Sequence, residues 1–216
     1  MKKTLFILAI IAGAMMLSCN PDDDDNNKGG NNDNGQHNGH EWVDLGLPSG
    51  LKWATCNVGA SSPEDYGDYF AWGETETKAE YTEENSLTHG KQMSDISGNT
   101  NYDAAIVNWG GGWRMPTGSE MEELVNNCKW ERTQVNGVNG SKVIGPNGSC
   151  IFLPAAGDRF GSSLDDAGNY GRYWSSTPRY NDYYGNHARS LRFNYEEHCL
   201  GNGSRYYGRS VRPVTE

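Results

Sequence analysis

Tyrosine and arginine side chains, which are suited to ligand recognition, gather toward the C-terminal end of this 216-residue chain. Between Asn169 and Arg212 lie eight of the twelve tyrosines and seven of the ten arginines. Only three acidic residues lie there, so the segment has a formal charge of +4, whereas the whole chain has −10. Tyrosine offers a large contact area with few rotors, and arginine offers a planar fork of donors. This composition is typical of a binding face.

Within that segment, ten side chains have no evident role in a core, and we predict that they face outward and contact a ligand. They are Arg172, Arg179, Tyr180, Tyr183, Tyr184, Asn186, Arg189, Arg205, Tyr206 and Tyr207. The alternative is a solvated polar surface without a ligand. Tyr173, Trp174 and Leu191 recur as core positions of short strands, and Arg212 is a candidate structural partner for the acidic body.

Sequence motifs of catalysis are absent. The chain has no G-x-S-x-G, no H-E-x-x-H, no P-loop and no G-x-G-x-x-G. His89, His187 and His198 occur in polar segments without the spacing of metal ligands. The acidic run at residues 22–25 lacks the sixth-position glycine and twelfth-position glutamate of an EF-hand loop. We therefore expect no catalytic residue, no metal and no cofactor.

The overall composition bounds the class of protein. The apolar fraction is 35%, but 28 glycines and seven tryptophans accompany it, so one folded, turn-rich domain is expected. The net negative charge excludes a general nucleic-acid binder, because neutralising phosphates requires a basic face.

The N-terminus predicts export and lipidation. Lys2 and Lys3 precede an apolar run over residues 5–17, which is shorter than the ~20 residues of a membrane span. Leu17-Ser18-Cys19 resembles a lipoprotein cleavage box, so residues 1–18 are a predicted signal peptide and Cys19 the predicted lipidation site. An ordinary secretory signal with a chance cysteine is the alternative. We expect an outer-membrane lipoprotein, exposed on the cell surface and contacting the membrane only through its lipid.

The composition of residues 19–40 predicts a disordered tether. They are acidic and rich in Asn and Gly, and they contain no large apolar residue that could offset the entropy of ordering the chain. The acidic run resembles the export signal of Bacteroidota surface lipoproteins. The folded domain is then expected over residues 41–216.

Short strands, tight turns and one clear helix must position the binding residues. Thr117 and Glu120 form a capping box, and apolar residues follow from Met121 at helical spacing, which predicts a helix over 117–128. A shorter helix is expected over 102–109. The Asn-Gly pairs at 136–137, 139–140, 147–148 and 202–203 predict type I′ hairpin turns. Strands are expected over 41–45, 51–58, 142–144, 150–153, 173–176, 190–193 and 210–214, which gives an α+β class.

Several segments, taken together and in order, resemble a known family. They are Trp53-Ala54-Thr55-Cys56-Asn57-Val58-Gly59-Ala60, Gly111-Gly112-Trp113-Arg114-Met115-Pro116-Thr117, Ile151-Phe152-Leu153-Pro154-Ala155-Ala156-Gly157, Tyr173-Trp174-Ser175-Ser176-Thr177 and Ser210-Val211-Arg212-Pro213-Val214. The chain is similar over residues 41–216 to the Fibrobacter succinogenes major paralogous domain of Bacteroidota surface lipoproteins. The resemblance implies a C-type lectin-like fold, in which the strand over 42–45 would pair with the strand over 211–214. Within the second segment, we expect Trp113 in the core and Arg114 in a structural role.

The remaining cysteines suggest disulfides. An exported domain with four of them, Cys56, Cys128, Cys150 and Cys199, allows three pairings. Two of the family-like segments contain Cys56 and Cys128, so the resemblance favours Cys56 with Cys128 and Cys150 with Cys199. The alternative is that Cys128 is a small buried apolar residue of its helix.

Three functions follow as hypotheses. The first is a non-enzymatic surface module that binds an extracellular glycan or protein through the C-terminal Tyr, Arg and Asn side chains. It lacks the Glu-Pro-Asn and Trp-Asn-Asp motifs of calcium-dependent sugar-binding lectins, so calcium is not expected to bridge a sugar. The second is an oxidase like formylglycine-generating enzymes, and the third is a structural envelope lipoprotein. A variant of the first is a retroelement-diversified variable protein, because residues 179–207 are rich in Asn and Tyr.

Overall fold

The computed structural model describes residues 34–216. The predicted signal peptide (1–18), the lipidation site Cys19 and residues 19–33 of the predicted tether lie outside the described residues. The elements of the described part are β1 (Asn34–His37), β2 (His40–Asp44), β3 (Lys52–Ala54), α1 (Ala104–Trp109), α2 (Gly118–Asn127), β4 (Lys129–Val135), β5 (Val138–Ile144), β6 (Cys150–Pro154), β7 (Asp158–Phe160), β8 (Ser163–Asp165), β9 (Gly171–Pro178), β10 (His187–Phe193), β11 (His198–Ser204) and β12 (Val214–Thr215).

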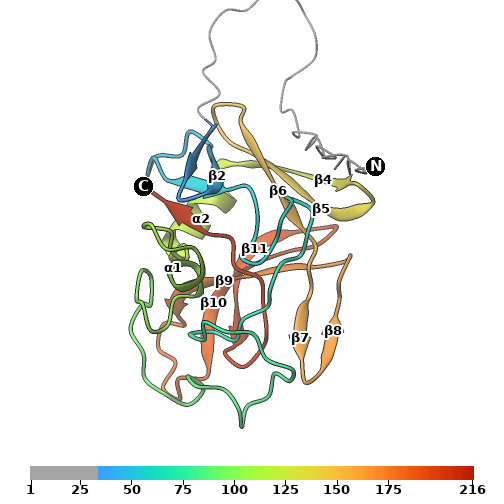
Figure 1. Cartoon of the computed structure of the whole chain (residues 1–216). Helices are drawn as coiled ribbons and strands as arrows, with labels where there is room; N and C mark the ends of the chain where they lie inside the picture. Colours follow the sequence, from blue (N-terminus) through green and yellow to red (C-terminus); the bar gives the residue numbers. More distant parts are fainter. Residues whose placement is uncertain (1–33) are drawn as a thin grey trace, which may run out of the picture.

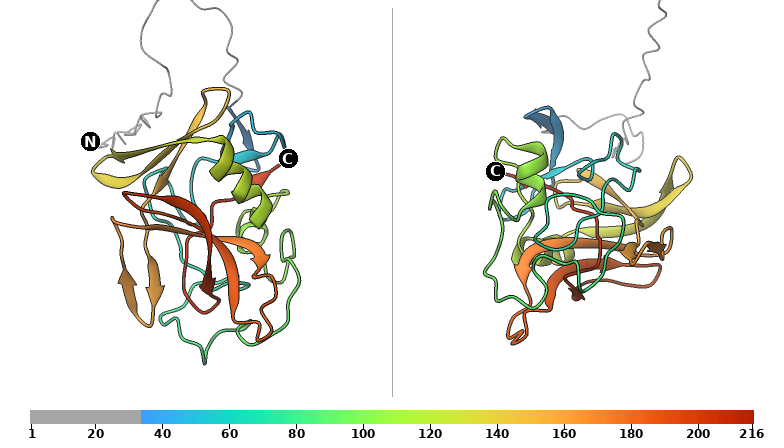
Figure 2. Two further views of the ribbon diagram at one scale, coloured as in Figure 1. Left: turned by 180° about the vertical axis from the view of Figure 1, so that it is seen from behind. Right: turned by 60° about the horizontal axis from the view of Figure 1, so that its bottom comes forward.

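Small antiparallel sheets dominate the fold, and the α+β class is confirmed. The strand orders are β1-β2-β3-β12, β4-β5-β6, β7-β8 and β11-β10-β9. Figure 1 shows the first sheet at the top beside the C-terminus, and the β7-β8 hairpin projecting next to the β9-β10-β11 sheet. Seen from behind, α2 lies between the β1-β2-β3-β12 sheet and the β9-β10-β11 sheet (Figure 2). Neither helix in the described part is long and apolar enough to cross a membrane.

The first and last strands share a sheet but are not neighbours. β12 pairs with β3, with Val214 opposite Trp53, and β2 pairs with the other edge of β3. The predicted direct pairing of 42–45 with 211–214 is therefore wrong, because β3 lies between them. Strand β12 is also much shorter than the predicted 210–214.

An additional hairpin precedes the expected start of the domain. β1 pairs with β2 across the turn Asn38-Gly39, whose φ angles of 47° and 82° suit a type I′ turn. Residues 34–40 thus belong to the fold rather than to the tether. Asn38 donates to the carbonyl of Trp109, which ties the hairpin to the end of α1.

Both helices form where the sequence predicts them. Thr117 caps α2, and the reciprocal bonds with Glu120 complete the capping box. Glu120 also accepts two bonds of 2.7 and 2.8 Å from the guanidinium of Arg114, so Arg114 has the structural role that was expected. This pairing and the bonds from Thr117 lower the pKa of Glu120, although burial opposes them. The cap and the ion pair thereby fix the start of the helix.

Only one of the four Asn-Gly pairs forms the predicted type I′ turn. Asn136-Gly137 forms the β4–β5 turn with two positive φ angles, as predicted. Residues 147–148 also turn, but only Gly148 has a positive φ, so the turn is not type I′. Residues 139–140 and 202–203 lie inside β5 and β11, where the predicted turns are wrong. At Gly203 the reason is packing, because a Cβ there would collide with the guanidinium of Arg209.

Besides a small cluster around Tyr81, two larger apolar clusters form the core. One joins α2 to the sheets through residues such as Met121, Trp53 and Tyr173. The other gathers Trp113 and further aromatic side chains, with Trp72 contributed by the long connection over residues 55–103. Five of the seven tryptophans are buried, including Trp113 as predicted. Large rings thus supply the core volume that the low apolar fraction does not.

The predicted disulfide pairs are wrong, because Cys56, Cys128 and Cys199 are free thiols. Cys56 packs against the second cluster, whereas Cys128 packs against the first, so the core separates them. Cys150 and Cys199 lie on β6 and β11, in different sheets. The alternative for Cys128 agrees with the structure, since it is a partly buried residue at the end of its helix, where burial raises its pKa to about 11.

Alkylation tests the state of these thiols. When the protein is unfolded without reductant, Cys56, Cys128 and Cys199 should all be alkylated, because none has a disulfide partner. In the folded protein Cys128 should react slowest at neutral pH, since the thiolate is the nucleophile and its pKa is raised. Peptide mass spectrometry reads both results. A disulfide-linked peptide containing any of the three would contradict the structure.

Arg212 is buried, and no carboxylate within residues 34–216 opposes it. It is 1% exposed, and its guanidinium donates to the side-chain oxygen of Asn57 and to the carbonyls of Ala54, Thr55 and Phe152. The expected ion pair with the acidic body is therefore wrong, since neutral oxygens take its place. These bonds join the end of β3 to β6 and to the C-terminal segment.

Substitution of Arg212 by lysine should destabilise the fold by about 2 kcal/mol or more. An ammonium group keeps the charge but has fewer donors, so at least one buried oxygen loses its partner. Urea denaturation measures the effect, and Arg179→Lys at an exposed position should change stability by no more than about 0.5 kcal/mol. Equal stabilities of the two variants would show that the fork of Arg212 is dispensable.

Candidate functional site

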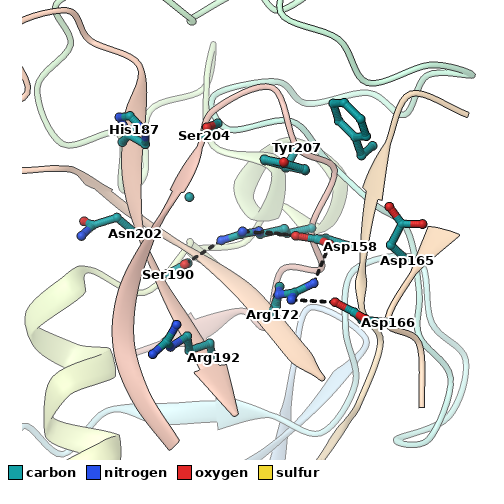
Figure 3. A pocket seen from close by; sticks show the side chains of 13 residues that line it. Asp158, Asp165, Asp166, Arg172, His187, Ser190, Arg192, Asn202, Ser204 and Tyr207 are labelled. Carbon is teal, nitrogen blue, oxygen red and sulfur yellow. Dashed lines mark hydrogen bonds and ion pairs between the residues drawn. The ribbon is translucent and has the colours of Figure 1, made fainter. Parts of the chain in front are cut away.

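A pocket of about 480 Å³ opens where the β7-β8 hairpin faces the β9-β10-β11 sheet. Figure 3 shows its polar side chains, with Asp165 and Asp166 at one end of the view and His187 and Asn202 at the other. We call it the Asp158 pocket. Its lining consists of Asp158, Phe160, Asp165, Asp166, Arg172, His187, Ser190, Arg192, Asn202, Gly203, Ser204, Tyr207 and Arg209.

Asp158 holds two arginines in the wall of the pocket. Its carboxylate is buried, and one oxygen accepts from Arg172 at 2.7 Å. The other oxygen lies 3.2 Å from two nitrogens of Arg209, whose remaining nitrogen donates to the hydroxyl of Ser190 at 2.7 Å. Figure 3 shows these bonds converging on Asp158. A carboxylate that bridges two guanidinium groups fixes both in place.

Both arginines also stack on aromatic rings. Arg209 lies 4.5 Å from the ring centre of Trp174, and Arg172 lies 4.8 Å from that of Tyr170. Burial lowers the pKa of Arg209 to about 10, and Asp158 opposes this effect. Arg209 therefore remains charged at neutral pH. Arg172 makes a second ion pair, at 2.7 Å, with the exposed carboxylate of Asp166.

Aromatic rings form another part of the lining. Phe160, at the end of β7, is 49% exposed, and its ring centre lies 5.5 Å from that of Tyr207. Tyr207 in turn stacks on Tyr206, with ring centres 5.0 Å apart. Burial raises the pKa of Tyr207, so its phenol stays protonated at neutral pH and can donate. An exposed phenylalanine beside a polar pocket presents an apolar surface to a ligand.

Polar groups around the rim remain available to a ligand. Asp165 and Asn202 are exposed, and no ion pair or side-chain hydrogen bond engages either of them within residues 34–216. Arg192 is exposed as well, although it donates to the sulfur of Cys199 at 3.0 Å and lies 3.1 Å from Glu197. The rim thus offers a hydrogen-bond acceptor in Asp165, donors in Arg192, and an amide in Asn202 that can both donate and accept.

The ten predicted binding residues do not form one face. Arg172 and Tyr207 line the Asp158 pocket, and Tyr206 lies against Tyr207. Arg189 is half-buried and 3.9 Å from Glu122 of α2, away from the pocket lining. Asn186 is half-buried beside β10, where its carbonyl accepts from the backbone of Arg205.

Four of the predicted residues project from the β9–β10 loop. Arg179 is exposed, and Tyr180, Tyr183 and Tyr184 are exposed by 85%, 84% and 70%. We call these three tyrosines the tyrosine loop. Gln92 supports it by donating to the carbonyls of Asp182 and Tyr183. A broad hollow of about 790 Å³ lies beside it, lined by Gln92, Met93, Pro178, Arg179, Asn181, Asp182, Tyr183 and Arg205.

Arg205 does not face outward, so the prediction for this residue is wrong. It is 1% exposed, and its guanidinium lies 4.3 Å from the ring centre of Trp72. It donates to the carbonyls of His187, Thr88 and Lys91. Arg205 thus joins the long connection to β10, and it supports the surface rather than contacting a ligand.

The sequence alone does not predict most residues of the Asp158 pocket. Asp158, Phe160 and Asp165 precede the basic segment, and nothing in their spacing places them beside it. The one available signal was charge: a segment of +4 that buries arginines requires acidic partners from elsewhere. That signal indicates a need for carboxylates but does not identify which ones.

Comparison of the chain with family models, with curated proteins and with solved structures found no match. The site must therefore be interpreted from its own geometry. No group of three or more metal-ligating side chains occurs in residues 34–216.

Asp158→Asn should destabilise the protein by about 3–5 kcal/mol, because the buried guanidinium of Arg209 would lose its only carboxylate among the described residues. Asp166→Asn is the matched control. It also breaks an ion pair with Arg172, but at an exposed carboxylate, so its effect should stay within about 1 kcal/mol. Thermal and urea unfolding distinguish them. Similar losses in both variants would refute the assignment of Asp158 as the central anion.

Proposed function

We propose that this chain is a surface-tethered, non-enzymatic recognition lipoprotein that binds an extracellular glycan or protein. Its anchor would be a lipid on Cys19 after removal of residues 1–18, and its place the exposed face of the outer membrane. The domain would have a C-type lectin-like fold. The motif order and the presence of β2 and β12 in one sheet support that fold assignment.

The Asp158 pocket is the observation that carries the proposal. Its volume falls within the range of about 300–1,000 Å³ that is usual for small-ligand sites. Ion pairs and stacking fix its arginines before any ligand arrives, so binding would require little ordering of the site. Exposed Phe160 and the rim groups would then make the direct contacts.

The tyrosine loop is a less favourable site. Its rings are among the most exposed side chains of the described part, and Tyr183 and Tyr184 contact each other edge to face at 5.2 Å. Few fixed neighbours surround these rings, so a ligand would have to order them. We therefore assign recognition to the Asp158 pocket, and the loop serves as the comparison in the tests.

The test is binding of the mature chain, residues 19–216, to an array of glycans and extracellular proteins. At least one ligand should bind, and Phe160→Ala should weaken that binding by about tenfold or more, because an anchor ring is lost. Replacing all three residues of the tyrosine loop by Ala should change affinity by less than about twofold.

Three results would contradict the proposal. Absence of any ligand on the array would favour a structural envelope protein. Oxidative turnover of cysteine-containing peptides would favour the oxidase. Loss of binding in the tyrosine-loop variant with full binding in Phe160→Ala would move the site to the loop.

A further inference from the structure

We propose that the Asp158 pocket takes an uncharged, hydroxyl-rich ligand, namely a neutral sugar residue whose ring packs on Phe160. This inference rests on the proposed function and specifies its ligand. Charge balance, the pattern of donors and acceptors, and the aromatic surface each support it separately.

The arginines of the pocket are already paired with carboxylates. Its lining holds three arginines and three aspartates. Arg172 and Arg209 are matched by Asp158 and Asp166, and Arg192 is matched by Glu197 outside the lining. An anionic ligand would have to compete with these carboxylates for the guanidinium groups. It would also approach Asp165, which has no ion-pair partner among the described residues.

A cationic ligand fits no better. It would approach Asp165 but would also have to enter beside three guanidinium groups, of which that of Arg209 is buried in the wall. Placing like charges together in a partly desolvated pocket is unfavourable. The absence of a net charge in the lining therefore selects an uncharged ligand.

The rim offers what hydroxyl groups need. A hydroxyl donates one hydrogen bond and accepts up to two, so neighbouring hydroxyls are best met by donors and acceptors side by side. Arg192 can donate, Asp165 can accept, and the amide of Asn202 can do both. The hydroxyl of Ser204 lies in the same lining. An apolar small molecule would leave these groups unpaired.

The aromatic surface completes the match. A sugar ring has an apolar face of C–H groups between its hydroxyls, and such a face packs on an aromatic ring. Phe160 is half exposed in the pocket, although the ring centres of Tyr207 and Tyr206 lie 5.5 and 6.2 Å from its own. The Phe160 surface therefore remains available for a ligand. Polar groups at the rim with an aromatic ring beside them favour a sugar over a peptide strand, which would need a row of backbone partners.

The experiment compares neutral oligosaccharides with hexuronic-acid oligosaccharides of the same linkage and length, using the mature chain and isothermal titration calorimetry. The neutral member of at least one pair should bind about tenfold more tightly than its acidic counterpart. Its affinity should change less than about twofold between low and high salt, since no ion pair forms on binding. Phe160→Ala should weaken it about tenfold, whereas Tyr180→Ala, at an exposed ring outside the pocket, should not.

The outcomes separate this inference from the proposed function. Tighter binding of the acidic sugar, with an affinity that falls as salt rises, would overturn the inference and leave the recognition function in place. If the chain binds a protein but no sugar, and Phe160→Ala abolishes that binding, the inference is also overturned while the recognition function is left in place. Absence of every ligand would overturn both.

Discussion

Three buried arginines of the C-terminal segment are the constraint on which this fold depends. Arg205, Arg209 and Arg212 come within eight residues of one another and are all removed from solvent. Among the described residues, only Arg209 of the three meets a carboxylate directly, and the other two donate to carbonyl and amide oxygens from distant parts of the chain. A buried guanidinium is costly unless its donors are paired. The chain must therefore bring those oxygens together.

This constraint shapes the surface above it. Asp158 is buried to meet Arg209, which sets the β7-β8 hairpin beside the β9-β10-β11 sheet and leaves the pocket between them. Arg205 in turn fixes the connection at residues 88–91 against β10. Three of the seven arginines of the C-terminal segment are thus used inside the molecule. What remains for a ligand is a balanced rim with one exposed ring, Phe160.

Local signals predicted part of the local structure. The capping box of Thr117 and the Asn136-Gly137 turn form as their spacing requires, because the governing hydrogen bonds lie within a few residues. Packing between residues distant in the chain could not be predicted from the sequence. Arg205 is of the same residue type as Arg179 and Arg192, which are exposed in the same segment, and Gly203 resembles a turn residue although it makes room for Arg209. The site was only partly predicted for the same reason, since the partners from β7 and β8 are distant in the sequence.

The most direct test of the account is a map of backbone amide shifts by NMR during titration with a neutral oligosaccharide that binds. The account predicts that the largest changes fall on Phe160, Tyr207 and Asn202, around the Asp158 pocket, while the amides of the tyrosine loop stay nearly unchanged. Changes concentrated at Tyr180, Tyr183 and Tyr184, with the pocket unaffected, would contradict it.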